Sequence, residues 1–404
     1  MDIGSQMTSL SPFLCTLFFL SSSALAAKSK DTASQERFRF RPGKGIQFTS
    51  ADNMFSLSLR LRVQLFYTLD ETNKVWQHSF NVRRARIKFV GHFFGKANEF
   101  KLALGVSPKD LDVEDGIPRQ TPLRDWYVDL KHLSWLHVRV GQFKVGYSLS
   151  RMTSSKRFLF VDRSLVNKEF ELDRDMGVAL SFPHLFSVPT LQLLLTAVMG
   201  EGMGVDALSN EGLLYVVRLQ YQPLGKLKSH SEDSLRRPPT PKLHIGFSYA
   251  FAHKAKRIQG NHGTSLPNNV QSDIHFMTAD LVMKWSGFSF VFQWMTRSGE
   301  YTAVHPDEQT TQALKTLLPR NGWGMFGHIG YLLPSLPLSF GLRFGHIHPS
   351  DNKTSLTALN EFGGVFNVYF TKTHSYKLQL DYFYLFASLT NGDHQMRIQL
   401  QTTF

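Results

Sequence analysis

Residues 55–67, FSLSLRLRVQLFY, alternate almost without a break between apolar and polar side chains, and Phe66 is the exception. Phe55 and every second residue up to Tyr67 are apolar or aromatic. Apart from Phe66, the residues between them are Ser56, Ser58, Arg60, Arg62 and Gln64. Successive side chains of an extended strand point to opposite faces, so this stretch predicts a strand with one apolar and one polar face. The polar face carries Arg60 and Arg62.

The same alternation recurs along the chain in segments of about ten residues that are separated by polar or Gly/Pro-rich breaks. It predicts 16 strands, at 55–67, 85–93, 100–106, 126–130, 136–140, 175–182, 190–199, 212–222, 242–252, 273–285, 287–297, 322–332, 336–346, 361–370, 375–387 and 395–404. Helical patterning is confined to 308–318, which predicts one short helix inside a long loop.

Two architectures are compatible with such strands. A soluble sandwich would turn the apolar faces inward, whereas a membrane barrel is apolar outside and polar inside. The strands are long enough to cross a bilayer when tilted, and a sheet in lipid must close to pair its edges. The aromatic-rich apolar faces favour an all-β, transmembrane antiparallel β-barrel of about 16 strands, which encloses a water-filled lumen. The last strand, ending at Phe404, resembles the signal that such barrels present to their assembly machinery.

Composition supports the barrel. Lys plus Arg exceeds Asp plus Glu by 13, and the mean hydropathy of −0.19 argues against a helical membrane protein. Residues 1–27 have the apolar core and small-residue end of a secretory signal peptide, although a buried N-terminal strand is the alternative. The only cysteine, Cys15, lies there, so no disulfide is expected in the mature chain. We assign 28–53 to a periplasmic N-terminal segment and 54–404 to a transmembrane β-barrel porin domain.

Three stretches resemble the phosphate-selective porin O and P family. They are FNVRRARIKFVG at 80–91, LRDWYVDL at 123–130, and VRVGQFKVGYSLSRMTSSKRFLFVDRSLVN at 138–167, which continues into DRDMGVALS at 173–181. The resemblance implies a 16-stranded trimeric porin in the outer membrane of a Gram-negative bacterium. It also implies an inward-folding loop, and a basic track that draws anions to a narrow site in the middle of the pore.

The resemblance also assigns roles to individual residues. Arg83 and Arg84 match paired arginines near the constriction, and Asp125 matches an acidic residue beside it. Ser154 and Ser155 match serines of the inward-folding loop, Arg151 stands where a phosphate-specific member has lysine, and Arg60 matches a basic residue higher on the path. Strict alternation turns only one of Arg83 and Arg84 inward, so a bulge or the start of a strand is required for both to line the lumen. A second constriction loop is expected near 298–322, where Lys315 and Arg320 are the basic candidates.

Basic residues crowd the first half of the chain, where a row of guanidinium and ammonium groups suits the passage of oxyanions. The predicted anion path comprises Arg60, Arg62, Arg83, Arg84, Arg86, Lys88, Asp125, Arg151, Ser154, Ser155 and Lys156. Further basic residues of this region are Arg139, Lys144, Arg157 and Arg163. The alternative is that some of these cations pair with acids in the lumen or bind lipopolysaccharide phosphates at the rim.

The sequence therefore predicts an anion-selective outer-membrane porin for phosphate or related anions. A general small-solute diffusion porin with weak anion preference, an outer-membrane barrel enzyme and a soluble secreted β protein are the alternatives. We find no nucleophile–base pattern, no calcium motif in the acidic stretch 110–115 and no third partner for His346 and His348, so no catalytic residue, metal or cofactor is expected. The expected partners are small anions, outer-membrane lipid and lipopolysaccharide, the barrel-assembly machinery and two further copies of the chain, but no nucleic acid.

Overall fold

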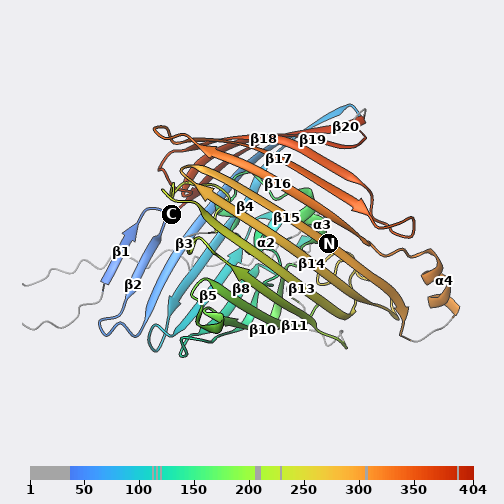
Figure 1. The fold of residues 1–404 in the computed structure, drawn as a ribbon, viewed down its shortest axis with the longest axis horizontal. Helices are drawn as coiled ribbons and strands as arrows, with labels where there is room; N and C mark the ends of the chain where they lie inside the picture. The colour runs from blue at the N-terminus through green and yellow to red at the C-terminus, as the bar shows by residue number, and fades with distance from the viewer. Residues whose placement is uncertain are drawn as a thin grey trace, which may run out of the picture. The chain divides into compact units, whose positions relative to one another are not determined.

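The fold was analysed in a computed structural model, which describes residues 37–111, 113–114, 117–118, 121–204, 211–227, 230–304, 308–388 and 391–404. The expected signal peptide, 1–27, lies outside the described residues. Nearly all described strands belong to one antiparallel sheet of 18 strands, drawn in Figure 1. Sixteen of them form a closed barrel, because each pairs with the next along the chain and β20 pairs with β3.

The barrel strands agree with the 16 predicted segments and differ from them mainly in length. They are β3 (Ser56–Thr72), β4 (Val75–His92), β5 (Asn98–Gly105), β8 (Leu123–Leu130), β9 (His137–Lys144), β10 (Arg174–Phe182), β11 (Leu191–Val198), β12 (Leu214–Tyr221), β13 (Lys242–Ala255), β14 (Val270–Trp285), β15 (Phe288–Ala303), β16 (Gly322–Leu332), β17 (Leu338–Pro349), β18 (Leu359–Tyr369), β19 (Tyr376–Ser388) and β20 (Asn391–Thr403). The prediction of an all-β antiparallel barrel is therefore confirmed.

The remaining elements are short. They are the strands β1 (Arg37–Arg41), β2 (Gly45–Thr49), β6 (Val113–Glu114) and β7 (Ile117–Pro118), the helices α1 (Pro108–Leu111), α2 (Leu149–Met152), α3 (Leu165–Phe170) and α4 (Glu308–Thr316), and two 3-10 turns at Ser155–Arg157 and Leu185–Ser187. Helix α4 confirms the helix predicted at 308–318. None of the helices in the described part of the chain has the length and apolar character needed to cross a membrane.

The hairpin β1–β2 extends the sheet beyond the closed barrel. Strand β2 pairs with the first residues of β3, and β20 pairs with β3 farther along it. The sequence pattern predicts no strand between residues 28 and 53, and we assign this whole segment to the periplasm. The structure shows that part of this segment continues the sheet of the barrel.

The exposure of the side chains shows which face of each strand points out of the barrel. In β12, Tyr215, Val217 and Leu219 are 45%, 46% and 41% exposed, whereas Arg218 and Gln220 are buried. Strand β3 follows the same rule, with Leu61 exposed and Arg62 buried. The apolar faces therefore point out of the barrel and the polar faces into it, as a membrane barrel requires and a soluble sandwich does not.

The two ends of the barrel differ in their connections. The end at which β3 begins has mostly short turns, such as 286–287 and 333–337, and we call it the short-turn end. The other end, the long-loop end, carries the connection 145–173 between β9 and β10. This connection, which we call the inward loop, includes α2 and α3 and folds into the barrel (Figure 1).

The inward loop forms an apolar core inside half of the barrel. Tyr147, Phe158, Phe160 and Phe170 of the loop are at most 1% exposed. They pack against inward-facing apolar residues of the wall, which include Val216, Ala250, Phe276, Met295 and Phe383. The lumen is therefore asymmetric, because buried apolar side chains of the loop and the wall fill one side of it.

An arginine on the outer face tests the orientation of the barrel in lipid. Leu342 on β17 is 51% exposed between Phe340 and Phe344. We expect Leu342→Arg to lower the free energy of unfolding in lipid vesicles by about 2–4 kcal/mol, because a charge on the lipid-facing surface is poorly solvated. Urea titrations of the purified barrel measure this value, and Leu342→Met serves as the control. Equal stability of the two variants would mean that the apolar face does not lie in lipid.

Candidate functional site

The inward loop is bonded to one side of the barrel wall through its backbone. The Arg218 guanidinium of β12 donates to the carbonyl of Tyr147 at 2.9 Å, and the Gln379 amide of β19 donates to that of Leu159 at 2.8 Å. Arg343 of β17 donates to the carbonyl of Asp162 at 2.9 Å. These polar side chains satisfy buried loop carbonyls, so they hold the loop against β12–β19.

A second anchor joins the loop to the opposite wall. The Asp162 carboxylate forms ion pairs with Arg83 and Arg84 of β4, and the Arg84 contact is 3.2 Å. Burial alone would raise the pKa of the Asp162 carboxyl, but the charges of Arg83, Lys168 and Arg84 hold this pKa well below its usual range. The loop is therefore fixed across the lumen by a buried, charged contact.

A β-bulge makes this double contact possible. Gln64 of β3 lies opposite Arg84, but the next residue, Leu65, lies opposite Val82, so Arg83 is the extra residue of β4. The bulge re-aims the side chain and allows both arginines to reach one carboxylate. The bulge expected from the sequence is confirmed.

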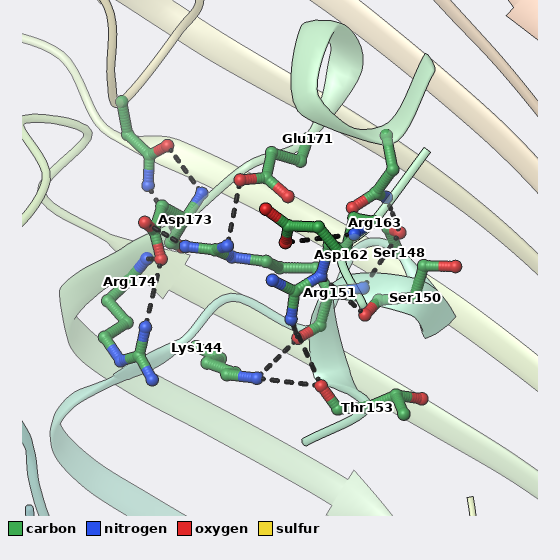
Figure 2. A network of polar contacts seen from close by, with 12 residues as sticks. Lys144, Ser148, Ser150, Arg151, Thr153, Asp162, Arg163, Glu171, Asp173 and Arg174 are labelled. Carbon is green, nitrogen blue, oxygen red and sulfur yellow. Dashed lines mark hydrogen bonds and ion pairs between the residues drawn. The ribbon is translucent and has the colours of Figure 1, made fainter. Parts of the chain in front are cut away.

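Arg151 is also neutralised by carboxylates. Its guanidinium forms ion pairs with Glu171, at 2.9 Å, and with Asp173, all within the inward loop (Figure 2). The Lys144 ammonium lies nearby and donates to the carbonyls of Arg151 and Thr153 at 2.6 and 3.1 Å. Figure 2 shows these groups gathered around the loop. Arg151, which the sequence places on the predicted anion path, is thus held by carboxylates of the inward loop itself.

Next to these residues lies a strongly basic cavity of about 260 Å³. Eight basic and three acidic residues line it, together with Ser155: they are Arg84, Arg86, Lys109, Arg124, Lys144, Arg151, Arg163 and Arg174, and Asp110, Glu171 and Asp173. The Ser155 hydroxyl is buried and has no hydrogen-bond partner in the described part of the chain. Such an excess of cations between low-dielectric walls attracts anions. We call this space the outer cavity.

A second cavity continues toward the short-turn end. It has a volume of about 330 Å³ and shares Lys144 with the outer cavity. Lys101 of β5 and Arg139 of β9 line it, as does Asp125 of β8. We call it the inner cavity. The barrel strands that line the two cavities are β4, β5 and β8–β11, and residues of the inward loop complete the lining.

Two pairs of cations face each other on the inner surface of β3 and β4. Arg62 lies directly opposite Arg86, and Arg60 lies directly opposite Lys88. Arg86 is bonded to Asp110 at 2.6 Å, and Arg60 donates to the hydroxyl of Ser58. Like charges directly opposite one another destabilise a sheet. These four cations therefore do not stabilise the pairing of β3 with β4, and another role is needed to explain them.

Arg62 is the most exceptional of these cations. It is 4% exposed, and none of its three guanidinium nitrogens has a hydrogen-bond partner among the described residues. Lys88 likewise has no carboxylate within ion-pair distance in the described ranges. Buried donors without a partner are rare, so the Arg62 guanidinium requires an explanation beyond the packing of the barrel.

The remaining predicted residues have distinct positions. Asp125 bridges Arg174 at 2.7 Å and Lys101 at 2.9 Å, so it neutralises part of the path between the two cavities. Lys156 donates to the carbonyl of Gly43 and to the Ser375 hydroxyl, near the short-turn end. Ser154 precedes the 3-10 turn at Ser155–Arg157 and makes no side-chain capping bond. The structure thus gathers Arg84, Arg86, Arg151 and Ser155 around one cavity and spreads the others along the lumen.

Sequence reasoning missed several basic residues of the two cavities, namely Lys101, Lys109, Arg124 and Arg174. Arg124 is instructive because a second bulge turns it inward: Ala103 lies opposite Asp125, whereas Leu104 lies opposite Leu123. Arg124 and Asp125 are consequently both buried. Two adjacent charged residues at the start of an otherwise alternating strand were the signal that could have indicated this bulge.

Two other connections also enter the lumen. Asn261, between β13 and β14, is 1% exposed and donates to Asp175, and Arg320 pairs with Glu169 of α3 at 2.8 Å. At the short-turn end, Glu232 accepts the backbone N–H of Leu159 at 3.0 Å. The inward loop is therefore supported from both ends of the barrel, and the segment 298–322 expected to form a second constriction contributes Arg320 to that support.

Removal of the Asp162 carboxylate tests the cross-lumen anchor. We expect Asp162→Asn to lower the free energy of unfolding by about 3 kcal/mol, because Arg83 and Arg84 would lose their buried counter-charge. The open-channel current should also fluctuate more, since the inward loop would be held from one side only. Chemical denaturation and single-channel recording measure the two effects, with the exposed Asp351→Asn as the control. A quiet, fully stable Asp162→Asn channel would contradict the proposed anchor.

Comparisons with known proteins agree with this geometry. No curated protein sequence matches the chain. The fold is similar to the OmpT outer-membrane protein of Vibrio cholerae in a loop L8 deletion form, at 7% identity and a TM-score of 0.54 over 87% of this chain and 100% of that one. It is also similar to Pseudomonas putida OprB at high pH, at 13% identity and a TM-score of 0.53 over 87% and 95%.

A trimer form of Vibrio cholerae OmpT is similar at 9% identity, with a TM-score of 0.51 over 87% of this chain and 99% of that one. The family described as phosphate-selective porin O and P matches residues 57–227, the part of the chain that holds the inward loop and both cavities. The family is one of channels and not of enzymes, as expected from the sequence. The chain is therefore similar to the phosphate-selective porin O and P family over residues 57–227, and its closed 16-strand barrel has the fold of outer-membrane porins.

Proposed function

We propose that this porin is an anion-selective channel for phosphate or related small anions, and that the anions pass along the β3–β11 side of the lumen. The observation that carries the proposal is the pair of cross-strand cation contacts, Arg62 with Arg86 and Arg60 with Lys88, in which the buried Arg62 guanidinium has no partner in the described part of the chain. An oxyanion would supply the missing acceptor, and a charge-assisted hydrogen bond to it contributes roughly 1.5–3 kcal/mol.

The basic residues divide into two groups with different tasks. Arg83, Arg84 and Arg151 already have carboxylate partners, so their role in this proposal is to position the inward loop. Arg62 and Lys88 have none among the described residues, so they are free to bind a passing anion. The alternative in the sequence analysis, that some cations pair with acids of the lumen, thus describes the first group and not the second.

The arrangement of the cations at successive levels of the lumen supports passage of anions and not only their binding. Along β4, Arg84, Arg86 and Lys88 point inward at successive levels toward the short-turn end. Lys144 then connects the outer cavity to the inner one. A series of similar, shallow sites allows an ion to leave each site as easily as it enters, which conduction requires.

The unpaired cations are tested by removing their charge without removing their size. We expect the double variant Arg62→Gln with Lys88→Gln to lower the chloride-to-potassium permeability ratio and to raise the phosphate concentration that half-blocks the chloride current by about tenfold, equivalent to about 1.4 kcal/mol. The difference should shrink at 1 M salt, where charges are screened within about 3 Å. Reversal potentials and block curves in planar bilayers measure both quantities.

Lys372→Gln, in the exposed turn between β18 and β19, is the matched control for a lost positive charge. A wild-type pore that prefers potassium to chloride would refute the anion channel. An anion-selective wild type with an unaffected double variant would instead place the filter elsewhere. Discrimination between phosphate selectivity and general anion diffusion comes from the wild-type block curve, since a general diffusion porin is not blocked by phosphate at low concentration.

We also propose that the channel is a homotrimer. A trimer form is described for the structurally similar OmpT of Vibrio cholerae, and the family resemblance implies the same state. The mass of the complex in mild detergent tests the proposal, and a monomer under these conditions would contradict it. Contact with lipopolysaccharide and folding by the barrel-assembly machinery follow from the location of the barrel in the outer membrane.

A further inference from the structure

The inner cavity differs from the outer one in having an apolar side. Lys101 of β5 and Arg139 of β9 line it, as does Lys131, which directly follows β8. The apolar residues of the lining are Leu194 of β11, Met152 of α2, Ala179 of β10 and Phe143 of β9. The lining of this space of about 330 Å³ therefore combines charged residues with a group of apolar ones, which we call the charged wall and the apolar wall.

The charged wall retains an excess of positive charge. Arg139 is held by Asp129 at 2.7 and 2.8 Å and lies over the ring of Tyr127 at 4.0 Å. Lys101 is paired with Asp125. The Lys144 ammonium, however, donates only to two backbone carbonyls among the described residues, so its charge is not neutralised by a carboxylate.

The apolar wall is formed by tight packing between the inward loop and the barrel. A Cβ atom at Gly146 would collide with the side chain of Leu194, so the loop backbone lies directly against β11 at this point. Phe143 is only 2% exposed, which fixes its ring in place. Met152, with its flexible thioether, can adapt to groups of different shape.

Inorganic phosphate cannot use such a wall, because a small hydrated oxyanion gains nothing from contact with hydrocarbon. An anion that carries an apolar group would gain from both sides of the cavity, since burial of its hydrocarbon surface is favourable while Lys144 and Lys101 receive its charge. The combination of one unneutralised ammonium, a stacked aromatic–guanidinium pair and a hydrocarbon wall is characteristic of sites for amphipathic anions.

We propose that the inner cavity is a binding site for organic anions, namely carboxylates or phosphate monoesters with a compact aromatic or branched aliphatic group. The anionic head lies at Lys144 and Lys101, and the apolar group lies against Phe143, Leu194 and Met152. This inference rests on the proposed anion channel, and it extends the range of solutes beyond inorganic phosphate.

The test compares three blockers of the chloride current through the reconstituted full-length channel: phenyl phosphate, methyl phosphate and inorganic phosphate. They have similar head groups and differ in apolar surface. We expect phenyl phosphate to half-block the current at roughly one tenth of the methyl phosphate concentration, because its ring removes more hydrocarbon from water. Methyl phosphate and inorganic phosphate should differ by less than about threefold.

Leu194→Ala should reduce the preference for phenyl phosphate to about threefold or less and leave the block by inorganic phosphate unchanged. Leu195→Ala is the matched control, since Leu195 is the next residue of β11 and points to the opposite face. If Leu194→Ala does not fold, Met152→Ala removes apolar surface from the same cavity through the loop and should have the same effect.

Equal block by phenyl and methyl phosphate, in a channel that inorganic phosphate does block, would overturn this inference and leave the anion channel intact. A preference for phenyl phosphate that survives both variants would also overturn it, because the site would lie elsewhere. A channel that none of the three blocks, and that shows no anion preference, would instead contradict the proposed function itself.

Discussion

The contact of Asp162 with Arg83 and Arg84 is the constraint on which the organisation of the lumen depends. A long loop inside a water-filled barrel keeps one position only if its polar groups form hydrogen bonds or ion pairs with the wall there. The backbone of the inward loop is satisfied by the wall from β12 to β19, and the Asp162 carboxylate is satisfied by β4. Because both attachments are buried, the loop divides the lumen into a packed half and an open half.

This division gives a physical reason for the unequal pairing of the basic residues. Arg83, Arg84 and Arg151 are matched by carboxylates of the inward loop, and Figure 2 shows Arg151 with Glu171 and Asp173. Arg62 of β3 is buried and lacks such a partner among the described residues. In the proposed function, the paired cations position the inward loop, and the unpaired cations conduct the anions.

Much of the fold could be predicted because alternation is a direct consequence of a barrel wall with lipid on one side and a polar lumen on the other. The segment 55–67 alone indicated the face that carries Arg62, and β3 confirms it. The hairpin β1–β2 was missed because each of its strands has only five residues, too few for a periodic pattern to stand out.

The site was less predictable, since its pairings join residues far apart in the sequence. The bulge at Arg83 followed from the need to turn two adjacent arginines inward, so local geometry was sufficient to anticipate it. Its partner Asp162 lies 79 residues away, and no local pattern distinguishes this carboxylate from other acids. The sequence therefore indicated some of the cations that line the cavities, such as Arg84 and Arg86, but it could not indicate which cations are neutralised.

The most direct measurement of an open and a packed half is the reactivity of single cysteines in the conducting channel. Ser181 lines the inner cavity, whereas Ser289 is 1% exposed on β15 in the half that the inward loop fills. In a background that lacks Cys15, we expect a negatively charged thiosulfonate reagent to reduce the current through Ser181→Cys and to leave Ser289→Cys unaffected. Modification of both positions at similar rates, or of Ser289→Cys alone, would contradict an anion path confined to the β3–β11 side of the barrel.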